Sequence, residues 1–338
     1  MKRQRNMRIT FDCIRNKATY ALLLSCMGVL LGACGQEPTD VMEESAVTEI
    51  AETVDLSGAA GISDDTVQQE GNIAEEVVSP EESAVLPKND DILQFVDAFG
   101  EMHETTIDHS IPQHTYDYSK LTKDGMLYTY QDERYTSRVG IDVSKYQGTI
   151  HWDAVKEQGI EFVFIRIGYR GYGEAGTINL DQCFQDNIKG AQAAGLDVGV
   201  YFFAQAVNEE EAIEEAEFVV KSLQGYELQL PVVYDPETIR NDVARTDNVT
   251  GEQFTKNTRA FCDCIRENGY DAMIYSNMMW EAYEFDLKQL SDIPIWYADY
   301  EALPQTPYDF SIWQYTEQGR IDGIEGTIDL NLQFCPMP

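Results

Sequence analysis

The sequence predicts an α/β protein: an irregular (β/α) barrel of the TIM type, preceded by a disordered acidic tether. Two observations lead to this fold class. Short apolar segments alternate with helical patterns over about the last 200 residues, and residues 35–94 are acidic and contain no aromatic residue. Strands that alternate with helices form parallel sheets buried on both faces. About eight candidate strands in this length suit a closed barrel better than an open sheet.

The candidate strands share a high content of Val, Ile, Phe and Tyr. In chain order they cover 138–143, 162–168, 198–203, 231–235, 272–276, 294–298, 311–315 and 327–330. Helical patterns separate the earlier strands: one over 183–194, one after a predicted cap at Asn208 and Glu211, and one from Thr250 to Gly269. These patterns fade after Asp299, so we expect the barrel to be irregular at its end.

The first 33 residues have the pattern of a secretory signal peptide. Six Lys and Arg precede an apolar stretch at 21–31, which is too short to span a bilayer comfortably. The stretch ends in Leu31-Gly32-Ala33-Cys34, which resembles a bacterial lipobox, where the cysteine is lipidated and becomes the mature N-terminus. We therefore expect a lipid at Cys34 to anchor the protein to the outer face of the bacterial membrane, facing the cell wall. The alternatives are a signal peptide cut elsewhere and an uncleaved anchor helix.

Residues 34–100 are predicted to form a solvated tether. Between 35 and 100 there are 17 acidic residues, one basic residue (Lys88) and no aromatic residue before Phe95. Such a segment cannot bury enough apolar surface to offset the entropy of ordering, and its charges repel one another. Residues 101–136 contain more tyrosines, so we expect a partly ordered lead-in there. Residues 137–338 form the predicted barrel domain.

The composition excludes several classes of function. A formal net charge of −35 opposes binding to nucleic acid, because the chain would repel a polyanion. No Cys-x-x-Cys pair and no histidine cluster is present, so we expect neither a metal nor a cofactor. The sequence does not decide whether the four cysteines of the last 200 residues are free thiols or form disulfides. We expect a monomer.

Acidic residues stand near the ends of three predicted strands. These are Asp142, the pair Asp235 and Glu237, and Asp329. Because a β/α barrel carries its chemistry at the carboxyl ends of its strands, we expect them to meet at one rim. Asp235 and Glu237 lie two apart on an extended chain and so share a face, which Pro236 favours. Two close carboxylates cannot both ionise freely, so one has a raised pKa, as protonation of a glycosidic oxygen requires. The alternative is that Asp235 caps a turn and Glu237 is merely solvated.

Several motifs in order resemble those of family 25 glycoside hydrolases, the Chalaropsis-type lysozymes. The first is Gly140-Ile141-Asp142-Val143-Ser144-Lys145-Tyr146-Gln147-Gly148, followed by Trp152. The others are Asp235-Pro236-Glu237 at the end of its strand, and the segments 162–166, 199–203, 296–298, 311–315 and 323–331. The likeness covers roughly residues 138–334 and nothing earlier.

The resemblance implies an N-acetylmuramidase, which cleaves the β-1,4 bond between N-acetylmuramic acid and N-acetylglucosamine in peptidoglycan glycan strands. It assigns the general acid/base to Glu237. Asp235 supports this group or orients the substrate's 2-acetamido group in a substrate-assisted attack, and Asp142 and Asp329 complete the acidic floor. The chain departs from the family pattern at Pro236, where an apolar residue other than proline is more usual.

Aromatic residues near the strand ends are candidate surfaces for binding sugars. They are Tyr201, Trp296, Tyr275, Tyr234 and Trp313, with Tyr146 standing where the family often has tryptophan. The alternative is a place in the core, which is more common for aromatic residues in strands. Arg166 is alone in an apolar strand, and we expect it to pair with an acid rather than touch substrate.

Two other functions compete with the muramidase. One is a catalytically silent lipoprotein that only binds peptidoglycan, and the other is a related retaining hydrolase of the chitinase kind. Four retained carboxylates favour an enzyme over a binder, since binding needs no acid pair. The opening motif around Asp142 and Tyr146 argues against the chitinase kind.

Overall fold

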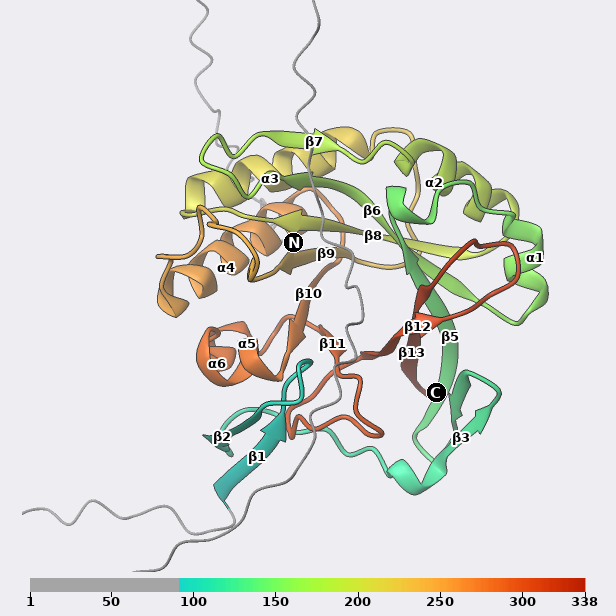
Figure 1. Ribbon diagram of the computed structural model, residues 1–338, viewed down its shortest axis with the longest axis horizontal. Helices are drawn as coiled ribbons and strands as arrows, with labels where there is room; N and C mark the ends of the chain where they lie inside the picture. Colours follow the sequence, from blue (N-terminus) through green and yellow to red (C-terminus); the bar gives the residue numbers. More distant parts are fainter. Residues whose placement is uncertain (1–90, 338) are drawn as a thin grey trace, which may run out of the picture. The chain divides into compact units, whose positions relative to one another are not determined.

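The computed structural model describes residues 91–337 and contains a closed eight-stranded barrel (Figure 1). The α/β barrel and all eight predicted strands are thereby confirmed. The strands are β5 (Tyr135–Val143), β6 (Phe162–Arg170), β8 (Asp197–Ala204), β9 (Val232–Pro236), β10 (Ala272–Asn277), β11 (Ile295–Ala298), β12 (Ile312–Gly319) and β13 (Ile328–Pro336). Their order is β5-β13-β12-β11-β10-β9-β8-β6, and pairing between β6 and β5 closes the ring.

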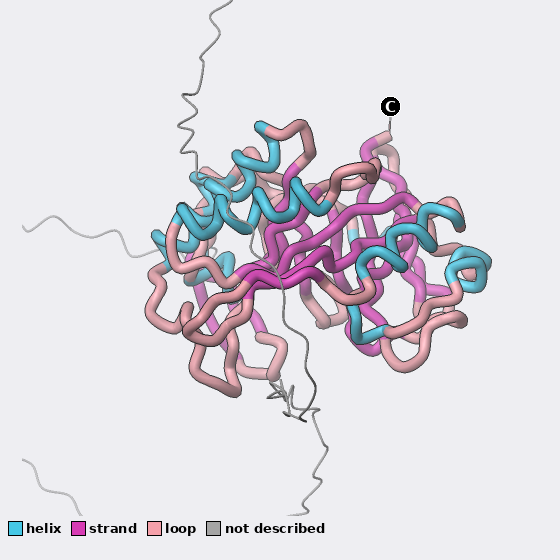
Figure 2. The backbone as a smooth tube through the Cα atoms, turned by 90° about the horizontal axis from the view of Figure 1, so that it is seen from above, coloured by secondary structure: helices cyan, strands magenta, loops and turns pink. Residues whose placement is uncertain are grey.

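The barrel is irregular at its end, as predicted. The other seven barrel strands pair in parallel around the ring, whereas β13 runs antiparallel to both β12 and β5. The short strand β7 (Ile178–Leu180) adds to the edge of β6. The helices are α1 (Trp152–Glu157), α2 (Phe184–Ala193), α3 (Glu209–Ser222), α4 (Gly251–Glu267), α5 (Met278–Tyr283) and α6 (Leu287–Leu290). Figure 2 shows them on the outside of the strands.

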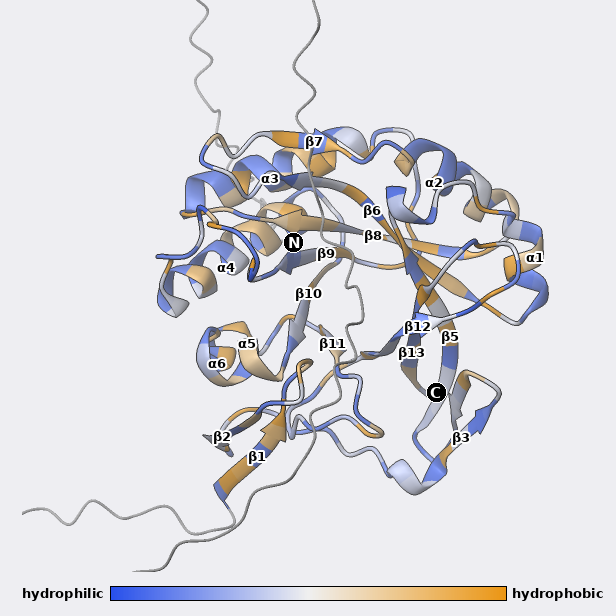
Figure 3. Ribbon diagram, viewed as in Figure 1, coloured by the Kyte–Doolittle hydropathy of each residue, from blue (hydrophilic) through white to orange (hydrophobic). Residues whose placement is uncertain are grey.

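The longer helices begin at the predicted caps. The side chain of Asn208 accepts a hydrogen bond from the Glu211 backbone N–H at 2.9 Å, which starts α3. Thr250 accepts one from the Gln253 N–H at 3.3 Å, which starts α4. Both helices have an apolar and a polar face (Figure 3), and the apolar face is buried against the strands.

Side chains alternate between two cores along each strand. In β6, Val163 and Ile165 point outward and pack under the helices, whereas Phe162 and Phe164 point inward. The inward side chains of the other strands fill the barrel with them: Val233, Met273, Trp296 and Ile312, together with Leu230. The barrel is therefore packed, and its polar inward residues lie above this apolar layer.

Glycines make room for the two inward phenylalanines. A Cβ atom at Gly140 would lie 2.3 Å from the Phe162 ring, and one at Gly199 would lie 2.4 Å from the Phe164 ring. Either substitution would force the barrel strands apart. Gly140 of the opening motif is thus required by packing directly beneath the predicted site.

The region before the barrel has its own short elements. Strands β1 (Ile92–Val96) and β2 (Met102–Thr106) form a hairpin, and β3 (Leu121–Asp124) and β4 (Leu127–Tyr130) form another. The prediction of a tether up to residue 100 is therefore wrong for its last residues, because Phe95 finds a buried position. The predicted signal peptide, the lipid site at Cys34 and the tether up to residue 90 lie outside the described residues.

The state of the cysteines, which the sequence left open, is decided among residues 91–337. Cys183, Cys262, Cys264 and Cys335 are all free thiols. Among these residues, none of the helices combines the length and the apolar character needed to cross a membrane.

Candidate active site

The four predicted catalytic carboxyl groups come together at the mouth of the barrel. Asp142 on β5 and Asp329 on β13 are cross-strand neighbours, and their carboxyl groups are hydrogen-bonded. Asp235, at the end of β9, lies close enough to Asp142 and Glu237 for their charges to raise its pKa. Because β13 runs antiparallel, the beginning of that strand reaches the rim where the parallel strands end.

Two amide side chains hold Asp142 in place. Its Oδ2 accepts hydrogen bonds from Gln314 Nε2 at 2.9 Å and from Asn331 Nδ2 at 2.8 Å. Burial raises the pKa of Asp142, and these two bonds oppose the rise. Burial and the neighbouring Asp142 charge also raise the pKa of Asp329 well above its usual range. The Asp142–Asp329 pair therefore keeps a proton at neutral pH.

Aromatic side chains orient the two amides in turn. Tyr275 and Tyr300 both donate to Gln314 Oε1, at 2.8 and 3.0 Å, and Trp296 Nε1 donates to Asn331 Oδ1 at 2.7 Å. With its oxygen occupied by two hydroxyl groups, the Gln314 amide must present its NH₂ group to Asp142. The carboxylate and its supports form one connected network.

Asp235 and Glu237 differ sharply in their surroundings. Asp235 is 4% exposed, and burial, followed by the charges of Glu237 and Asp142, raises its pKa well above the usual range. The nearby guanidinium of Arg166 opposes this rise. Glu237 lies just beyond the end of β9 and is exposed. The prediction that a close carboxyl pair contains one group with a raised pKa agrees with this geometry, and that group is Asp235.

Arg166 pairs with an acid, as predicted, but with one that the sequence analysis did not name. It follows Phe162 and Phe164 in the inward row of β6, and its Nε donates to Asp181 Oδ2 at 2.8 Å. Asp181 is buried and also accepts the backbone N–H of Lys145 at 3.1 Å. Among the described residues, the buried atoms Arg166 Nη2 and Asp235 Oδ1 have no hydrogen-bond partner.

Three of the six predicted sugar-binding aromatics have suitable positions. Tyr201 and Tyr275 are partly exposed and lie on top of the inner core. Tyr146 is exposed and follows β5 at the rim, with the Arg166 guanidinium 5.0 Å from its ring centre. These three rings are accessible from the mouth.

The other three, Trp296, Tyr234 and Trp313, are buried, so their prediction as sugar-binding surfaces is wrong. Trp296 points inward but lies one layer too deep, stacked on Phe164 at 4.7 Å between ring centres. Tyr234 faces outward onto Phe261 of α4, also at 4.7 Å. Trp313 faces outward as well and donates to the Asp299 carbonyl oxygen at 2.8 Å.

Sequence reasoning missed four polar residues that build the site: Gln314, Asn331, Tyr300 and Gln205. The signal for the first two was strand alternation. Gln314 is two residues from the inward Ile312, and Asn331 is two residues from Asp329. Tyr300 and Gln205 lie in loops, where no periodic pattern indicates direction.

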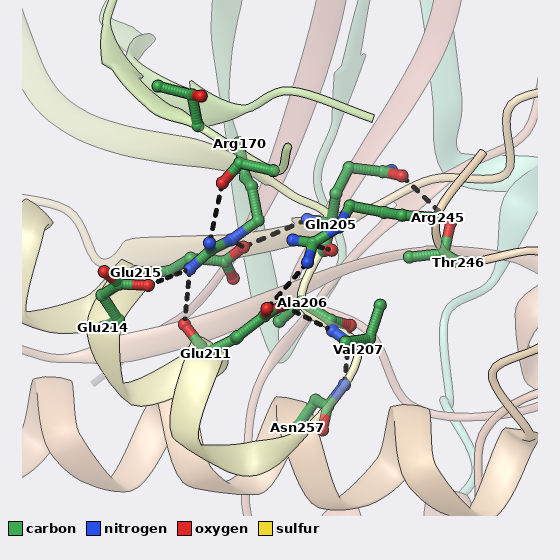
Figure 4. Close-up of polar contacts among 12 residues, drawn as sticks. Arg170, Gln205, Ala206, Val207, Glu211, Glu214, Glu215, Arg245, Thr246 and Asn257 are labelled. Carbon is green, nitrogen blue, oxygen red and sulfur yellow. Dashed lines mark hydrogen bonds and ion pairs between the residues drawn. The ribbon is translucent and has the colours of Figure 1, made fainter. Parts of the chain in front are cut away.

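Gln205 connects the site to a buried polar network behind it (Figure 4). This residue follows β8 and is buried, and its Nε2 donates to the backbone carbonyl of Glu237 at 2.9 Å. Its Oε1 accepts from Thr246 Oγ1 at 3.0 Å, and its backbone N–H donates to Glu215 Oε1 at 3.2 Å. Gln205 thereby fixes the backbone that carries the predicted acid.

The network behind Gln205 is a set of ion pairs between α3 and its neighbours (Figure 4). Arg170 Nε binds Glu215 Oε1 at 2.7 Å, and Arg170 Nη2 binds Glu214 at 2.8 Å. Arg245 Nη2 binds Glu211 at 2.7 Å. Burial raises the pKa of Glu215 to about 7, and the Arg170 charge opposes this rise. Three carboxylates thus pair with two guanidinium groups here.

One group of residues among 91–337 has the donor atoms of a metal site: Asp97, Glu101 and His103 in the β1–β2 hairpin. The Asp97 carboxylate already accepts the backbone N–H groups of Phe99 and Glu101, both at 2.9 Å. Burial raises the pKa of Asp97, but these hydrogen bonds satisfy the buried carboxylate and lower its pKa overall. The expectation that the protein uses no metal or cofactor stays a prediction.

Residues 141–324 match the family described as glycosyl hydrolases family 25, and the chain belongs to this family. It is 29% identical over 194 residues to the autolytic lysozyme of Clostridium acetobutylicum, covering 57% of this chain and 54% of that protein. It is 27% identical over 201 residues to lysozyme M1 of Streptomyces globisporus, covering 57% and 66%. The chain thus spans between half and two thirds of these relatives.

A solved structure shares the fold. The spore cortex lytic enzyme SleM of Clostridium perfringens superposes with a TM-score of 0.51 at 23% identity, over 60% of this chain and 69% of that one. The barrel and the alternation described above are therefore an architecture known from experiment.

Proposed function

We propose that this protein is a peptidoglycan hydrolase, an N-acetylmuramidase that cleaves the β-1,4 bond between N-acetylmuramic acid and N-acetylglucosamine. The observation that carries the proposal is the gathering of Asp142, Asp235, Glu237 and Asp329 at the mouth of a family 25 barrel. Two relatives named as lysozymes support the substrate class. A silent binding protein would not need a buried acid cluster, which costs stability.

Glu237 is the proposed general acid. It is exposed in the free protein, and a bound glycan would remove water from its carboxyl group and favour the protonated form. Its proton passes to the glycosidic oxygen as the bond from that oxygen to C1 breaks. The leaving sugar departs with a hydroxyl group, and Glu237 becomes a carboxylate.

Asp235 is the proposed partner in a substrate-assisted attack. Its buried carboxyl group orients the N–H of the substrate's 2-acetamido group, whose carbonyl oxygen forms the new bond to C1. Asp235 keeps its proton throughout, and the carbonyl oxygen of its carboxyl group accepts the acetamido N–H; the single negative charge of the Asp142–Asp329 pair stabilises the cationic ring that results. Water then bonds to C1 and gives a proton to Glu237, and the acetamido group is restored with retention of configuration.

The Asp142–Asp329 pair forms the floor of this site. One proton shared between the two groups leaves a single negative charge, which Gln314 and Asn331 hold in a fixed position. A preorganised charge of this kind stabilises the cation that develops at C1. Tyr201, Tyr275 and the exposed Tyr146 provide surfaces for neighbouring sugars.

Product analysis tests the proposal. Purified peptidoglycan is digested with the protein, new reducing ends are reduced with borohydride, and the reduced sugars are identified. We expect reduced muramic acid. Reduced glucosamine would indicate a glucosaminidase, and the absence of any product under conditions where the protein sediments with the wall would indicate the silent binder.

We also propose that a lipid on Cys34 holds the enzyme at the outer face of the membrane, where it acts as a monomer on the adjacent wall. The lipobox-like sequence at 31–34 supports the proposal. Palmitate labelling in the native host tests it: the wild type should carry the label and Cys34→Ala should not. A labelled Cys34→Ala protein would overturn the anchor.

A further inference from the structure

The β1–β2 hairpin is attached to the barrel by specific contacts at its turn. Asp97 lies 3.6 Å from Arg240, whose guanidinium is centred 3.8 Å above the Phe99 ring. Val96 donates its N–H to Gln305 Oε1 at 2.8 Å and accepts from Gln305 Nε2 at 2.9 Å. The position of the turn is therefore fixed by charge, ring and backbone contacts together.

Arg240 and Gln305, which contact this turn, belong to loops that begin at the catalytic mouth. Arg240 is three residues beyond Glu237 in the chain. Gln305 donates its backbone N–H to Asp299 Oδ2 at 2.8 Å. Tyr300, the residue after Asp299, donates its hydroxyl hydrogen to Gln314 Oε1 in the site. The hairpin also contacts α5, which follows β10 (Figure 1). Its turn thus lies on the rim across which a substrate of a β/α barrel extends.

The exposed side chains of the turn are held in fixed positions by their contacts. Phe99 is 65% exposed and the Arg240 side chain 44% exposed, although the two groups are stacked. Asp97 beneath them has its two oxygens held by backbone N–H groups, His103 and Arg240. An accessible aromatic ring beside a guanidinium can pack on the C–H face of a sugar and bind a carboxylate.

We propose that Phe99 and Arg240 form a distal binding site for the peptidoglycan strand, beyond the sugars at the cleaved bond. Phe99 packs on a sugar ring, and Arg240 binds a carboxylate of the strand's lactyl or peptide substituents. The proposal rests on the proposed function and deepens it. The hairpin lies outside residues 141–324, so the match to the family does not include this half of the site.

Kinetics on long and short substrates test the distal site. The full mature chain and its Phe99→Ala and Arg240→Gln variants are assayed on long soluble glycan strands with stem peptides and on a tetrasaccharide too short to reach the hairpin. For each variant we expect KM on long strands to rise roughly three- to tenfold with kcat little changed, and both constants on the tetrasaccharide to stay at wild-type values. The Arg240→Gln effect should shrink at high salt, because the lost interaction is ionic.

Matched variants separate binding from folding. Met102→Ala removes another exposed apolar side chain from the same hairpin and should leave KM unchanged. Phe99→Tyr keeps an aromatic surface and should restore wild-type KM. An unchanged KM on long strands, or equal losses of kcat on both substrates, would overturn the distal site. Failure of the wild type to release reducing ends from either substrate would instead overturn the proposed function.

Discussion

Two buried clusters of carboxyl groups lie in this domain, and they are neutralised in different ways. Behind Gln205, Glu211, Glu214 and Glu215 of α3 pair with the guanidinium groups of Arg170 and Arg245. At the mouth, Asp142, Asp235 and Asp329 have one cation nearby among residues 91–337, namely Arg166, which is already paired with Asp181. Burial is therefore offset mainly by protons at the mouth and mainly by arginines behind it.

This difference in neutralisation distinguishes a cluster that stabilises the fold from one that is suited to catalysis. Behind Gln205, ion pairs fix the positions of helices and loops, and the Arg170 charge opposes the rise that burial causes in the pKa of Glu215. An acid cluster with too few cations keeps protons at neutral pH, and raised carboxyl pKa values of this kind are typical of catalytic sites. The same residue types thus serve two purposes, and the local number of cations decides which.

The largest effect is expected at the mouth. Glu237→Gln keeps the size of an exposed side chain but removes its proton, so turnover should fall by roughly 10²- to 10⁴-fold. Reducing-end release measures the loss, and an unchanged thermal midpoint verifies the fold. Turnover near the wild-type value would mean that another group is the acid.

The ion-paired cluster behind Gln205 should respond in stability rather than in chemistry. Arg170→Met leaves buried Glu215 without its partner, so the free energy of unfolding should fall by about 3–5 kcal/mol. Urea denaturation at pH 7 measures this change. Glu214→Gln is the control, because this glutamate is exposed and its loss should cost under about 1 kcal/mol. A small effect of Arg170→Met would show that the pair is not needed to offset burial.

Asp329 at the mouth and Asp292, which pairs with Arg259 and Arg266 away from both clusters, predict opposite dependences of stability on pH. The pKa of Asp329 is raised in the folded state, so above about pH 4 the folded protein binds more protons than the unfolded chain. Stability from this group is greatest at low pH and falls as pH rises towards the folded pKa. Between pH 5 and 8, the wild type should therefore lose about 2–4 kcal/mol relative to Asp329→Asn.

Asp292 provides the control for that trend. Hydrogen bonds from Arg259 and then Arg266 lower its pKa, so its contribution is lost only on acidification, as pH falls below the usual range of an aspartate. Asp292→Asn should leave the stability profile between pH 5 and 8 parallel to the wild type. A parallel profile for Asp329→Asn as well would contradict a raised pKa at the mouth.

Gln205, which links the two clusters, should give the smallest change in activity or stability when it is substituted. Gln205→Met removes the bond to the Glu237 carbonyl while roughly keeping side-chain volume, so kcat should fall about tenfold with KM little changed. The alkaline limb of the kcat–pH profile should also shift, because the acid is held less firmly. A fall in stability with unchanged kcat would make Gln205 merely structural.

Much of this arrangement could be predicted from the sequence, because local rules decide it. The eight strands, the Asn208 and Thr250 caps and the inward direction of Asp142 and Asp235 all follow from periodicity and capping. The same alternation should have excluded Tyr234, since neighbours on a strand face opposite sides. It should also have selected Gln314 over Trp313.

Other features depend on contacts that no local pattern contains. The side chain of Trp296 points into the barrel, as predicted. It lies below the mouth because it stacks on Phe164 in the deeper apolar layer, and no local pattern indicates that depth. Asp181 and Gln205 act through partners 15 and 32 residues away in sequence. The β1–β2 hairpin follows an acidic stretch that predicted a tether, and it is ordered by contacts distant in sequence: the burial of Phe95 beside Tyr283 and the hydrogen bonds between Val96 and Gln305.

Proton occupancy at the mouth is the central claim, and carbon-13 NMR of carboxyl-labelled aspartate titrated from pH 4 to 9 measures it most directly. Resonances are assigned with Asp142→Asn, Asp235→Asn and Asp329→Asn. We expect the Asp235 carboxyl carbon to keep its protonated shift at pH 7, as burial beside Glu237 and Asp142 requires. If every aspartate at the mouth were ionised by pH 5, the account would be contradicted.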